Sequence, residues 1–263
     1  MDDLLVPFTG DAAARECLTL SGDWLRRWVG SWVVGTGKVS WPLRDMASVP
    51  VLSSQPVRQF TWRARQKHRP GLQFMVSTGR HHGFESLEEQ RLLLALDFVN
   101  VVEVLPQPFE LDFEHAGGRG RHIPDFLAVL AGGGFWLFDV RPRSLVKEDD
   151  LLKFGAAREA AAACGWHYSV VTGWKPHVQA ALDHLSSQRR PLQDRMGLEA
   201  ELLDAASRGQ VRFGDLVAVT RLPAIARAHA THLLWHRRLG IDLGQPLGDG
   251  SMVWLAGRPG GVR

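Results

Sequence analysis

The chain contains few cysteines and no long apolar run, and each of these features excludes a class of protein. Cys17 and Cys164 are too few for a disulfide framework, and neither belongs to a cluster with metal-ligand spacing. No stretch approaches the roughly eighteen consecutive apolar residues of a transmembrane helix, and no signal peptide is recognisable. Internal repeats are also missing. We therefore expect a cytoplasmic protein that has no contact with membranes.

The excess of basic over acidic residues is small. The 263 residues carry a net charge of +3, with 45% hydrophobic and 22% charged residues. This composition is typical of a soluble chain, and the length allows two compact domains. A mild basic bias permits nucleic-acid binding without requiring it.

The charge is unevenly distributed along the chain. Residues 1–83 carry 11 basic and 6 acidic side chains, residues 84–194 carry 11 and 16, and residues 195–263 carry 9 and 6. An acidic centre between basic segments suits a metal site with DNA-binding arms. An unevenly charged solvated surface would give the same counts, so charge alone leaves both interpretations open.

The centre of the chain has the pattern of a β-hairpin. Two apolar runs, 123–130 and 135–140, flank a turn of three glycines at 132–134. Folding about this turn would place Asp125 opposite residues 139–141, with facing Cβ atoms about 4.5–5.5 Å apart. Because side chains alternate along a strand, Asp139 and Arg141 share one face and Val140 lies on the other.

Two carboxylates and a cation at the end of an apolar sheet suit a magnesium site, because Mg²⁺ takes oxygen ligands. Asp125 and Asp139 would repel each other if both were ionised without a cation. The alternative for Asp125 is structural: Pro-Asp favours turns, in which the carboxylate bonds its own backbone.

The motifs around the hairpin resemble a known family. Pro124-Asp125 and, fourteen positions later, Asp139-Val140-Arg141 resemble the core of PD-(D/E)xK nucleases, with Arg in the usual place of Lys. The order of Glu89, Gln107 and these motifs is similar to that of TnsA-like endonuclease subunits of heteromeric transposases, in the form common in actinobacteria. The resemblance covers approximately residues 59–185.

The resemblance implies a metal-dependent DNA endonuclease with Mg²⁺ as cofactor, for which Mn²⁺ would substitute. It implies a restriction-endonuclease-like fold, in which helices flank a mixed sheet. It also implies a bacterial, nucleoid-associated protein whose partners are DNA, a DDE transposase subunit and an AAA+ ATPase. The catalytic residues it implies are Glu89, Asp125, Asp139 and Arg141, and the metal site comprises Glu89, Asp125, Asp139 and Val140.

Glu89 has two competing interpretations. Ser86-Leu-Glu-Glu89 is a capping box, in which the Glu at the third helical position bonds back to the start of the helix. The family instead carries its catalytic Glu at this point, where an acidic residue at the start of the first core helix can reach the metal. Glu88 is the alternative if the alignment is displaced by one residue.

Arg141 departs from the family pattern, which ends in Gln-x-Lys. Arg retains the positive charge and can bind two phosphate oxygens, but its guanidinium stays protonated and cannot act as a base. We therefore expect an electrostatic role for Arg141 without proton transfer. Lys147 or Lys153 is the alternative source of an ammonium group.

Further basic residues are candidates for contact with DNA. The stretch 58–69 interleaves basic and aromatic residues, which suits either phosphate binding or a solvated surface. Arg121, just before the core strand, would contact phosphate or cap the strand. The spacing of Trp24, Trp28 and Trp32 by four residues suits a short helix at 23–32, and this stripe favours a packing face over a platform for bases. The predicted contacts are Arg63, Arg65, Lys67, Arg69, Arg121, Arg227, Arg237 and Arg238.

The C-terminal residues have the pattern of a winged helix. Predicted helices at 197–206 and 221–239, with a short strand and helix at 211–217 between them, precede a hairpin at 240–255 that is rich in Gly and Asp. Its last helix would contact phosphate or a partner protein, and its histidines lack the spacing of a zinc site. The predicted division is an N-terminal segment at 1–55, a nuclease domain at 56–186, a linker at 187–194 and a winged helix at 195–263.

Two other functions remain open from the sequence. The first is a catalytically weak or inactive assembly subunit of the same transposition system, which binds DNA and partners. The second is a transcription regulator built on the winged helix, which leaves the carboxylates of the central stretch unexplained.

Replacing Arg63, Arg65, Lys67 and Arg69 together with alanine is expected to weaken DNA binding and to make it less dependent on salt. Each Lys or Arg that contacts a phosphate releases counterions, so removing contacts lowers the slope of log affinity against log salt concentration. The measurement is a DNA-binding titration of both proteins across a salt series. An unchanged slope would mean that the stretch is an ordinary solvated surface.

Overall fold

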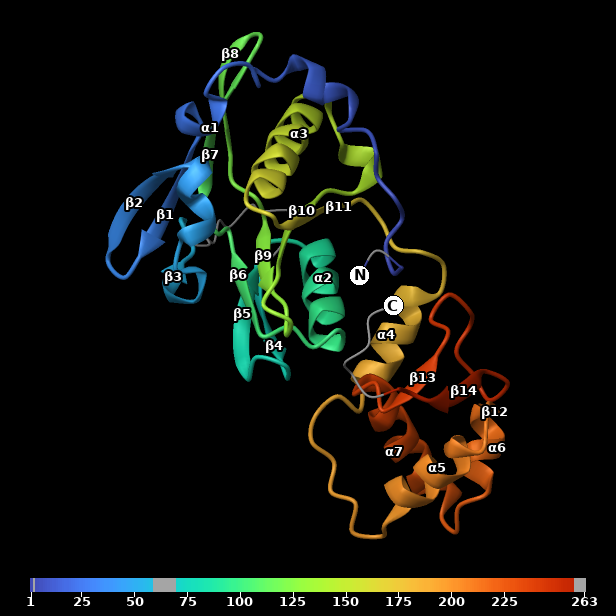
Figure 1. Cartoon of the computed structure of the whole chain (residues 1–263). Helices are drawn as coiled ribbons and strands as arrows, with labels where there is room; N and C mark the ends of the chain where they lie inside the picture. The colour runs from blue at the N-terminus through green and yellow to red at the C-terminus, as the bar shows by residue number, and fades with distance from the viewer. Residues whose placement is uncertain (2, 59–69, 258–263) are drawn as a thin grey trace. The chain divides into compact units, whose positions relative to one another are not determined.

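The computed structural model describes residues 1, 3–58 and 70–257 of the chain (Figure 1). The chain forms two compact units, Met1–Gly173 and Trp174–Arg263. This boundary precedes the helix α4 (Val178–Ser186), whereas the sequence predicted a linker after it, at 187–194. The N-terminal residues also belong to the first unit instead of forming a segment of their own.

The first unit contains a four-stranded mixed sheet in the order β11-β10-β9-β6. Its strands are β6 (Glu103–Pro106), β9 (Phe126–Val129), β10 (Phe135–Val140) and β11 (His167–Val171). The strand β9 is antiparallel to both neighbours, and β10 is parallel to β11. The predicted hairpin is therefore present, and Gly133, with φ of +85°, forms its turn. All four residues of β9 are buried, which accounts for its uninterrupted apolar sequence.

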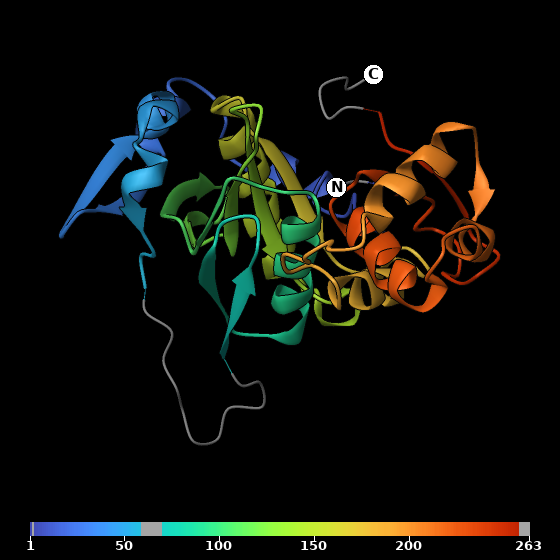
Figure 2. The same cartoon turned by 90° about the horizontal axis from the view of Figure 1, so that it is seen from below.

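A second, antiparallel sheet has the order β2-β1-β7-β8, with β3 also paired to β1. Its strands are β1 (Val29–Val34), β2 (Gly37–Pro42), β3 (Ser54–Gln55), β7 (Glu110–His115) and β8 (Gly118–His122). Figure 2 shows the hairpin of β1 and β2 in blue. A separate two-stranded hairpin contains β4 (Gly71–Met75) and β5 (Arg80–Phe84).

The predicted helix that carries the tryptophan stripe is wrong beyond its first turn. The helix α1 (Trp24–Arg27) is short, and Trp32 lies in β1. Pairing of β1 with β2, β3 and β7 stabilises the extended conformation here, and helical spacing alone does not compete with it. Trp28 and Trp32 are nevertheless fully buried, and Trp32 stacks on Phe109 with ring centres 4.8 Å apart. These tryptophans therefore form a packing face.

Helices flank the sheets of the first unit. The helix α2 (Leu87–Phe98) contacts β4 and β5, and α3 (Glu148–Ala163) contacts β11 and β8 (Figure 1). Four buried alanines let α3 lie close to the core: Ala156, Ala157, Ala160 and Ala161. The short 3-10 helices are η1 (Ala13–Cys17), η2 (Leu43–Ser48), η3 (Val51–Ser53) and η4 (Arg143–Leu145). The mixed α/β class predicted from the sequence is confirmed.

The second unit is mainly helical and carries a small sheet. Its elements after α4 are α5 (Leu198–Ser207), β12 (Val211–Arg212), α6 (Phe213–Ala218), α7 (Pro223–Trp235), β13 (Leu239–Ile241) and β14 (Met252–Leu255). The three strands are antiparallel in the order β12-β14-β13. The helix α4 contacts α7, and His232 Nδ1 lies 2.7 Å from the Gln188 carbonyl oxygen. The contact between α4 and α7 explains why α4 belongs to this unit.

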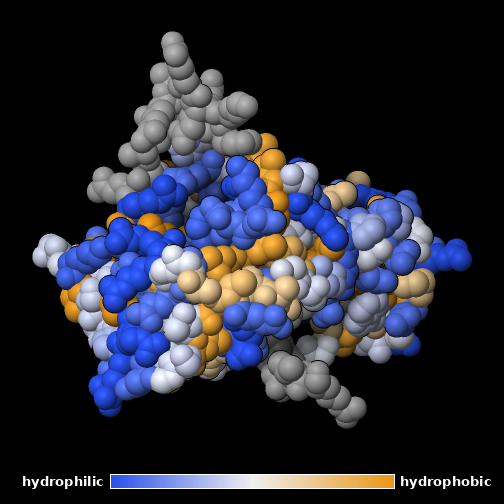
Figure 3. Space-filling model, turned by 90° about the horizontal axis from the view of Figure 1, so that it is seen from above, coloured by the Kyte–Doolittle hydropathy of each residue, from blue (hydrophilic) through white to orange (hydrophobic). Residues whose placement is uncertain are grey.

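The surface is mostly hydrophilic in the view of Figure 3, where orange apolar patches lie between larger blue areas. Leu52 and Leu72 are among the exposed large apolar residues. No helix in the described part of the chain combines the length and the apolar character needed to cross a bilayer.

Candidate active site

The hairpin of β9 and β10 brings Asp125 beside the predicted motif on the opposite strand. Phe126 pairs with Phe138, and the Asp125 N–H donates to the Phe138 carbonyl at 3.0 Å, so Asp125 faces Asp139. The Val140 N–H donates to Asp125 Oδ2 at 2.7 Å. The structure therefore places Asp125, Asp139 and Val140 together, and the Asp125 carboxylate bonds across the hairpin instead of to its own turn.

Asp139 is 1% exposed and is bonded at both carboxylate oxygens. His122 Nε2 lies 2.8 Å from Oδ1, and the Tyr168 hydroxyl donates to Oδ2 at 2.7 Å. Burial raises the pKa of Tyr168 well above its ordinary value, and the charge of Asp139 raises it further. Neither partner was predicted, although His122 stands next to Arg121 just before the core strand and Tyr168 is the only tyrosine of the chain.

Glu89 belongs to a cap at the start of α2, as predicted, but its carboxylate bonds to the Ser86 hydroxyl and the Glu85 N–H instead of the Ser86 N–H. The Ser86 hydroxyl accepts from the Glu89 N–H at 3.2 Å and donates to Glu89 Oε1 at 2.9 Å. Oε2 accepts from the Glu85 N–H at 2.8 Å. Burial raises the pKa of Glu89, and these hydrogen bonds partly oppose the shift. The alternative residue, Glu88, pairs with Arg91.

The negative charges of the neighbouring acidic groups act on the Asp125 carboxyl. Burial raises the pKa of Asp125 well above its ordinary value, and the negative charges of Asp139, Glu89 and Glu85 raise it further, whereas the Val140 N–H lowers it. Glu85 is an acidic neighbour that the sequence did not predict. Because concentrated carboxylates repel one another and hard divalent cations take oxygen ligands, this donor set fits Mg²⁺ or Mn²⁺.

Gln107 supports Asp125 through its main chain. Its N–H donates to the Asp125 carbonyl at 2.7 Å, and its own carbonyl accepts from the Val57 N–H at 3.0 Å. Gln107 has a φ of +46°, a left-handed conformation that is uncommon for a residue other than glycine. The segment before Arg58 is thereby attached next to the carboxylates.

Arg141 lies at the predicted strand end, but its side chain bonds to η4 and to the first turn of α3. Its Nε donates to the Leu145 carbonyl at 3.2 Å and lies 3.3 Å from Asp150 Oδ2. Asp150 also accepts from the Lys147 N–H at 3.0 Å, as part of the α3 cap. The alternative Lys153 lies within α3.

A second cation, Arg58, lies on the Glu89 side of the cluster. Its Nη2 is 2.5 Å from Glu85 Oε2, and its charge lowers the pKa of Glu89. Arg121, which was predicted to contact phosphate, pairs with Asp112 at 3.1 Å on the neighbouring strand. The other predicted contacts of this region, Arg63, Arg65, Lys67 and Arg69, lie outside the described residues.

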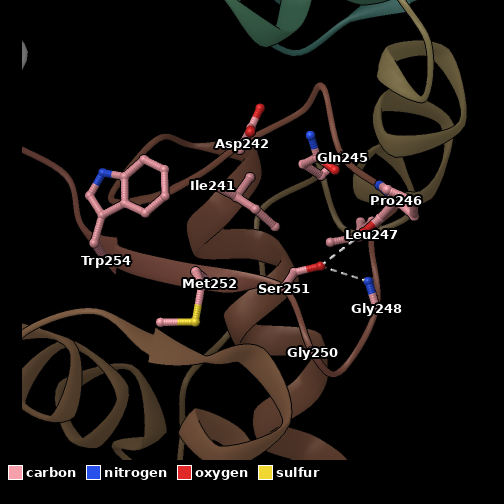
Figure 4. Close-up of a pocket in the computed structure, with 10 residues that line it drawn as sticks. All are labelled: Ile241, Asp242, Gln245, Pro246, Leu247, Gly248, Gly250, Ser251, Met252 and Trp254. Atoms are coloured by element: carbon pink, nitrogen blue, oxygen red, sulfur yellow. Dashed lines mark hydrogen bonds between the residues drawn. The ribbon is translucent and has the colours of Figure 1, made fainter.

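Two of the three predicted DNA contacts of the second unit, Arg227 and Arg238, are paired within it. Arg227 pairs with Asp249 at 2.7 Å, and Arg238 pairs with Glu199 at 2.7 Å. Arg237 is exposed, although partial desolvation lowers its pKa. The pocket at the loop between β13 and β14 contains no Lys or Arg among its lining residues (Figure 4). Ser251 closes this loop through bonds to the Gly248 N–H and the Pro246 carbonyl.

Three groups in the second unit have ligand atoms within 4.8 Å of one another: Asp194, Glu199 and His229. The two Asp194 oxygens accept from the N–H groups of Leu198 and Glu199 at 2.9 Å each, at the start of α5. Because Glu199 also pairs with a cationic arginine, a helix cap and an ion pair explain this cluster.

Comparison with protein-family models gives no match, and comparison with curated proteins gives none either. The functional assignment therefore depends on the residues of the site.

In the metal-free protein, Asp125→Asn is expected to raise the melting temperature at about pH 8 and to change it little near pH 4. Because the pKa of Asp125 is raised in the folded chain, its carboxyl favours folding while protonated, and this contribution is lost as pH rises through the raised pKa. A difference of 1 between the pKa values of the folded and unfolded chain corresponds to about 1.4 kcal/mol of stability. For a domain of this size, that shifts the melting temperature by roughly 3–5 °C. Asn keeps an oxygen that can accept from Val140.

The measurement is thermal unfolding in the presence of a chelator across this pH range. Asp45→Asn is the matched control, because Asp45 is exposed and pairs only with the adjacent Arg44 among the contacts described for it. If Asp125→Asn lowers the melting temperature equally at both pH values, repulsion between the Asp125 carboxylate and its acidic neighbours is not the main effect of Asp125 on stability.

Proposed function

We propose that this chain is a metal-dependent DNA endonuclease that cuts one strand at transposon ends, as a TnsA-like subunit of a heteromeric transposase. The observation that carries the proposal is the placement of Asp125 opposite Asp139, with Glu89 close enough to raise the pKa of Asp125. The mixed sheet with α2 and α3 supports a restriction-endonuclease-like fold.

The residues of the site would have different roles in phosphodiester hydrolysis. Asp125, Asp139 and Glu89 would hold Mg²⁺ or Mn²⁺, which when bound activates water and stabilises the charge of the leaving 3′-oxygen. The Val140 N–H orients Asp125 from the facing strand. Arg58 and Arg141 would supply positive charge for the phosphate oxygens. Neither arginine transfers a proton, because guanidinium groups stay protonated.

The second unit has the elements of a winged helix, with α5, α6 and α7 followed by the paired strands β13 and β14. We assign it to contact with a partner protein. The large apolar residues Val219, Leu222 and Ile225, around the start of α7, are exposed and suit contact with a protein. The resemblance to TnsA-like subunits supports a DDE transposase and an AAA+ ATPase as the partners, with the transposase making the other cut and transferring the strand.

One observation favours the second candidate, an assembly subunit without strong activity. The Arg141 side chain bonds to Asp150 and to the Leu145 carbonyl, and β10 carries no lysine. In this case the carboxylates would serve metal-stabilised folding and DNA binding without cleavage.

Addition of Mg²⁺ or Mn²⁺ is expected to raise the melting temperature of the parent protein, because a ligand that binds only the folded state stabilises it. Asp125→Asn is expected to abolish this increment. The measurement is thermal unfolding across a metal titration, with Asp45→Asn as a control that retains the increment. Equal metal responses in the parent and Asp125→Asn would exclude this carboxylate as a ligand.

The activity of Arg141 variants separates the two candidates. If Arg141 stabilises charge at the phosphate, Arg141→Ala is expected to reduce the cleavage rate by about 10²–10³-fold. Arg141→Lys is expected to keep substantial activity, since the charge stays on the same strand. Arg143→Ala, a change at the exposed arginine two positions later, is the matched control and is expected to cleave like the parent.

The assay is Mn²⁺-supported nicking of transposon-end DNA in the presence of the transposase partner. If the parent does not cleave and Arg141→Lys gains cleavage, arginine is an inactivating replacement and the assembly subunit is favoured. If all variants cleave alike, Arg141 is structural, and Lys147, Lys153 and Arg58 become the candidate cations.

A further inference from the structure

We propose that Tyr168 and His122 are positioning residues that hold the Asp139 carboxylate in the orientation needed for a divalent cation. This inference rests on the proposed function of the same site. Tyr168 donates its hydroxyl to Asp139 Oδ2 at 2.7 Å, and His122 Nε2 lies 2.8 Å from Oδ1. Because an ionised carboxylate only accepts hydrogen bonds, both partners act as donors toward it.

The sheet register explains how Tyr168 reaches Asp139. In the parallel pair of β10 and β11, Leu137 is opposite Tyr168 and Asp139 is opposite Val170. Alternation places Leu137 and Asp139 on one face of β10, and Tyr168 and Val170 on the same face of β11. The hydroxyl therefore approaches the carboxylate from the neighbouring strand, on the face that bears Asp139.

Both donors are immobilised by residues one helical turn apart on α3. The Arg158 guanidinium lies 5.1 Å from the centre of the Tyr168 ring, and Arg158 pairs with the buried Asp11. The His122 ring contacts Phe154 edge-on, with centres 6.5 Å apart. Positions i and i+4 of a helix lie on the same face, so a single face of α3 supports both donors.

This arrangement leaves further acceptor capacity on Asp139. Each carboxylate oxygen has two lone pairs, and the described contacts use one on each oxygen. The bonds also restrict rotation of the carboxylate beside Asp125. Partners of this kind behind a ligand typically contribute about 10–100-fold to metal affinity.

The test is a titration of the full-length chain with Mn²⁺ alone, following the free ion by its paramagnetic resonance signal. Tyr168→Phe removes only the hydroxyl and is expected to weaken Mn²⁺ binding by about 10–100-fold. Ser169→Ala is the matched control. It removes a hydroxyl from the same strand as Tyr168, one that accepts from Trp136 of β10, and it is expected to bind Mn²⁺ like the parent.

Variants of His122 provide an independent test if Tyr168→Phe does not fold. His122→Ala is expected to weaken Mn²⁺ binding, and His122→Gln to restore it in part, because the Gln amide can donate from a similar position. Melting temperatures without metal identify variants that are merely destabilised. A purely structural role would lower those temperatures and leave the Mn²⁺ affinity of the folded protein unchanged.

The outcomes separate this inference from the proposed function. Parent-like Mn²⁺ affinity in Tyr168→Phe and His122→Ala would overturn the positioning role and leave the metal site intact. A parent protein that shows no Mn²⁺ binding sensitive to Asp125→Asn would overturn the metal site, and the positioning role with it. Weakened binding in both variants with a parent-like control supports the inference.

Discussion

The hairpin of β9 and β10 places two carboxylates opposite each other, and the other features of the site follow from this constraint. Asp125 and Asp139 lie at the end of an apolar sheet, where a low local dielectric strengthens the repulsion between negative charges. The donors around them, the Val140 N–H, the Tyr168 hydroxyl and the His122 ring, orient the two groups. They do not cancel the negative charge, and the centre therefore remains suited to a divalent cation.

Features encoded in short stretches were predictable, and features that depend on distant pairing were not. The glycine turn and its two apolar runs indicated the hairpin, and Ser86 with Glu89 indicated the start of α2. Trp32 shows the limit of helical spacing as a signal. Trp32 pairs with Val39 of β2, and the residues before it in β1 pair with the distant β7, so strand pairing determined the backbone here. The unit boundary differed from the prediction for a similar reason: α4 belongs to the second unit through contacts with α7, which follows it only after two further helices.

In the candidate site, too, the residues joined by local pairing were predictable and those joined by distant pairing were not. The predicted Asp125, Asp139 and Val140 belong to one hairpin, so local pairing brings them together. Tyr168 reaches Asp139 only after the chain has passed through α3 and formed a parallel strand, and the register of such a pair has no local sequence signal. Arg58 reaches Glu85 across 27 positions, with the hairpin of β4 and β5 between them. Composition and spacing do not specify contacts of this kind.

The ion pair formed by the Arg141 side chain does not by itself argue against a catalytic role. Arg141 pairs with Asp150, and Arg58 pairs with Glu85, and both arginine side chains are more than one-third exposed. Pairs of this kind contribute only about 0–1 kcal/mol. A phosphate group can accept two guanidinium N–H bonds in parallel, which is a stronger interaction than either exposed pair. Asp150 would keep its bond to the Lys147 N–H, so α3 would remain capped after Arg141 left it. Pairing in the free chain is therefore compatible with a role for both arginines at the phosphate.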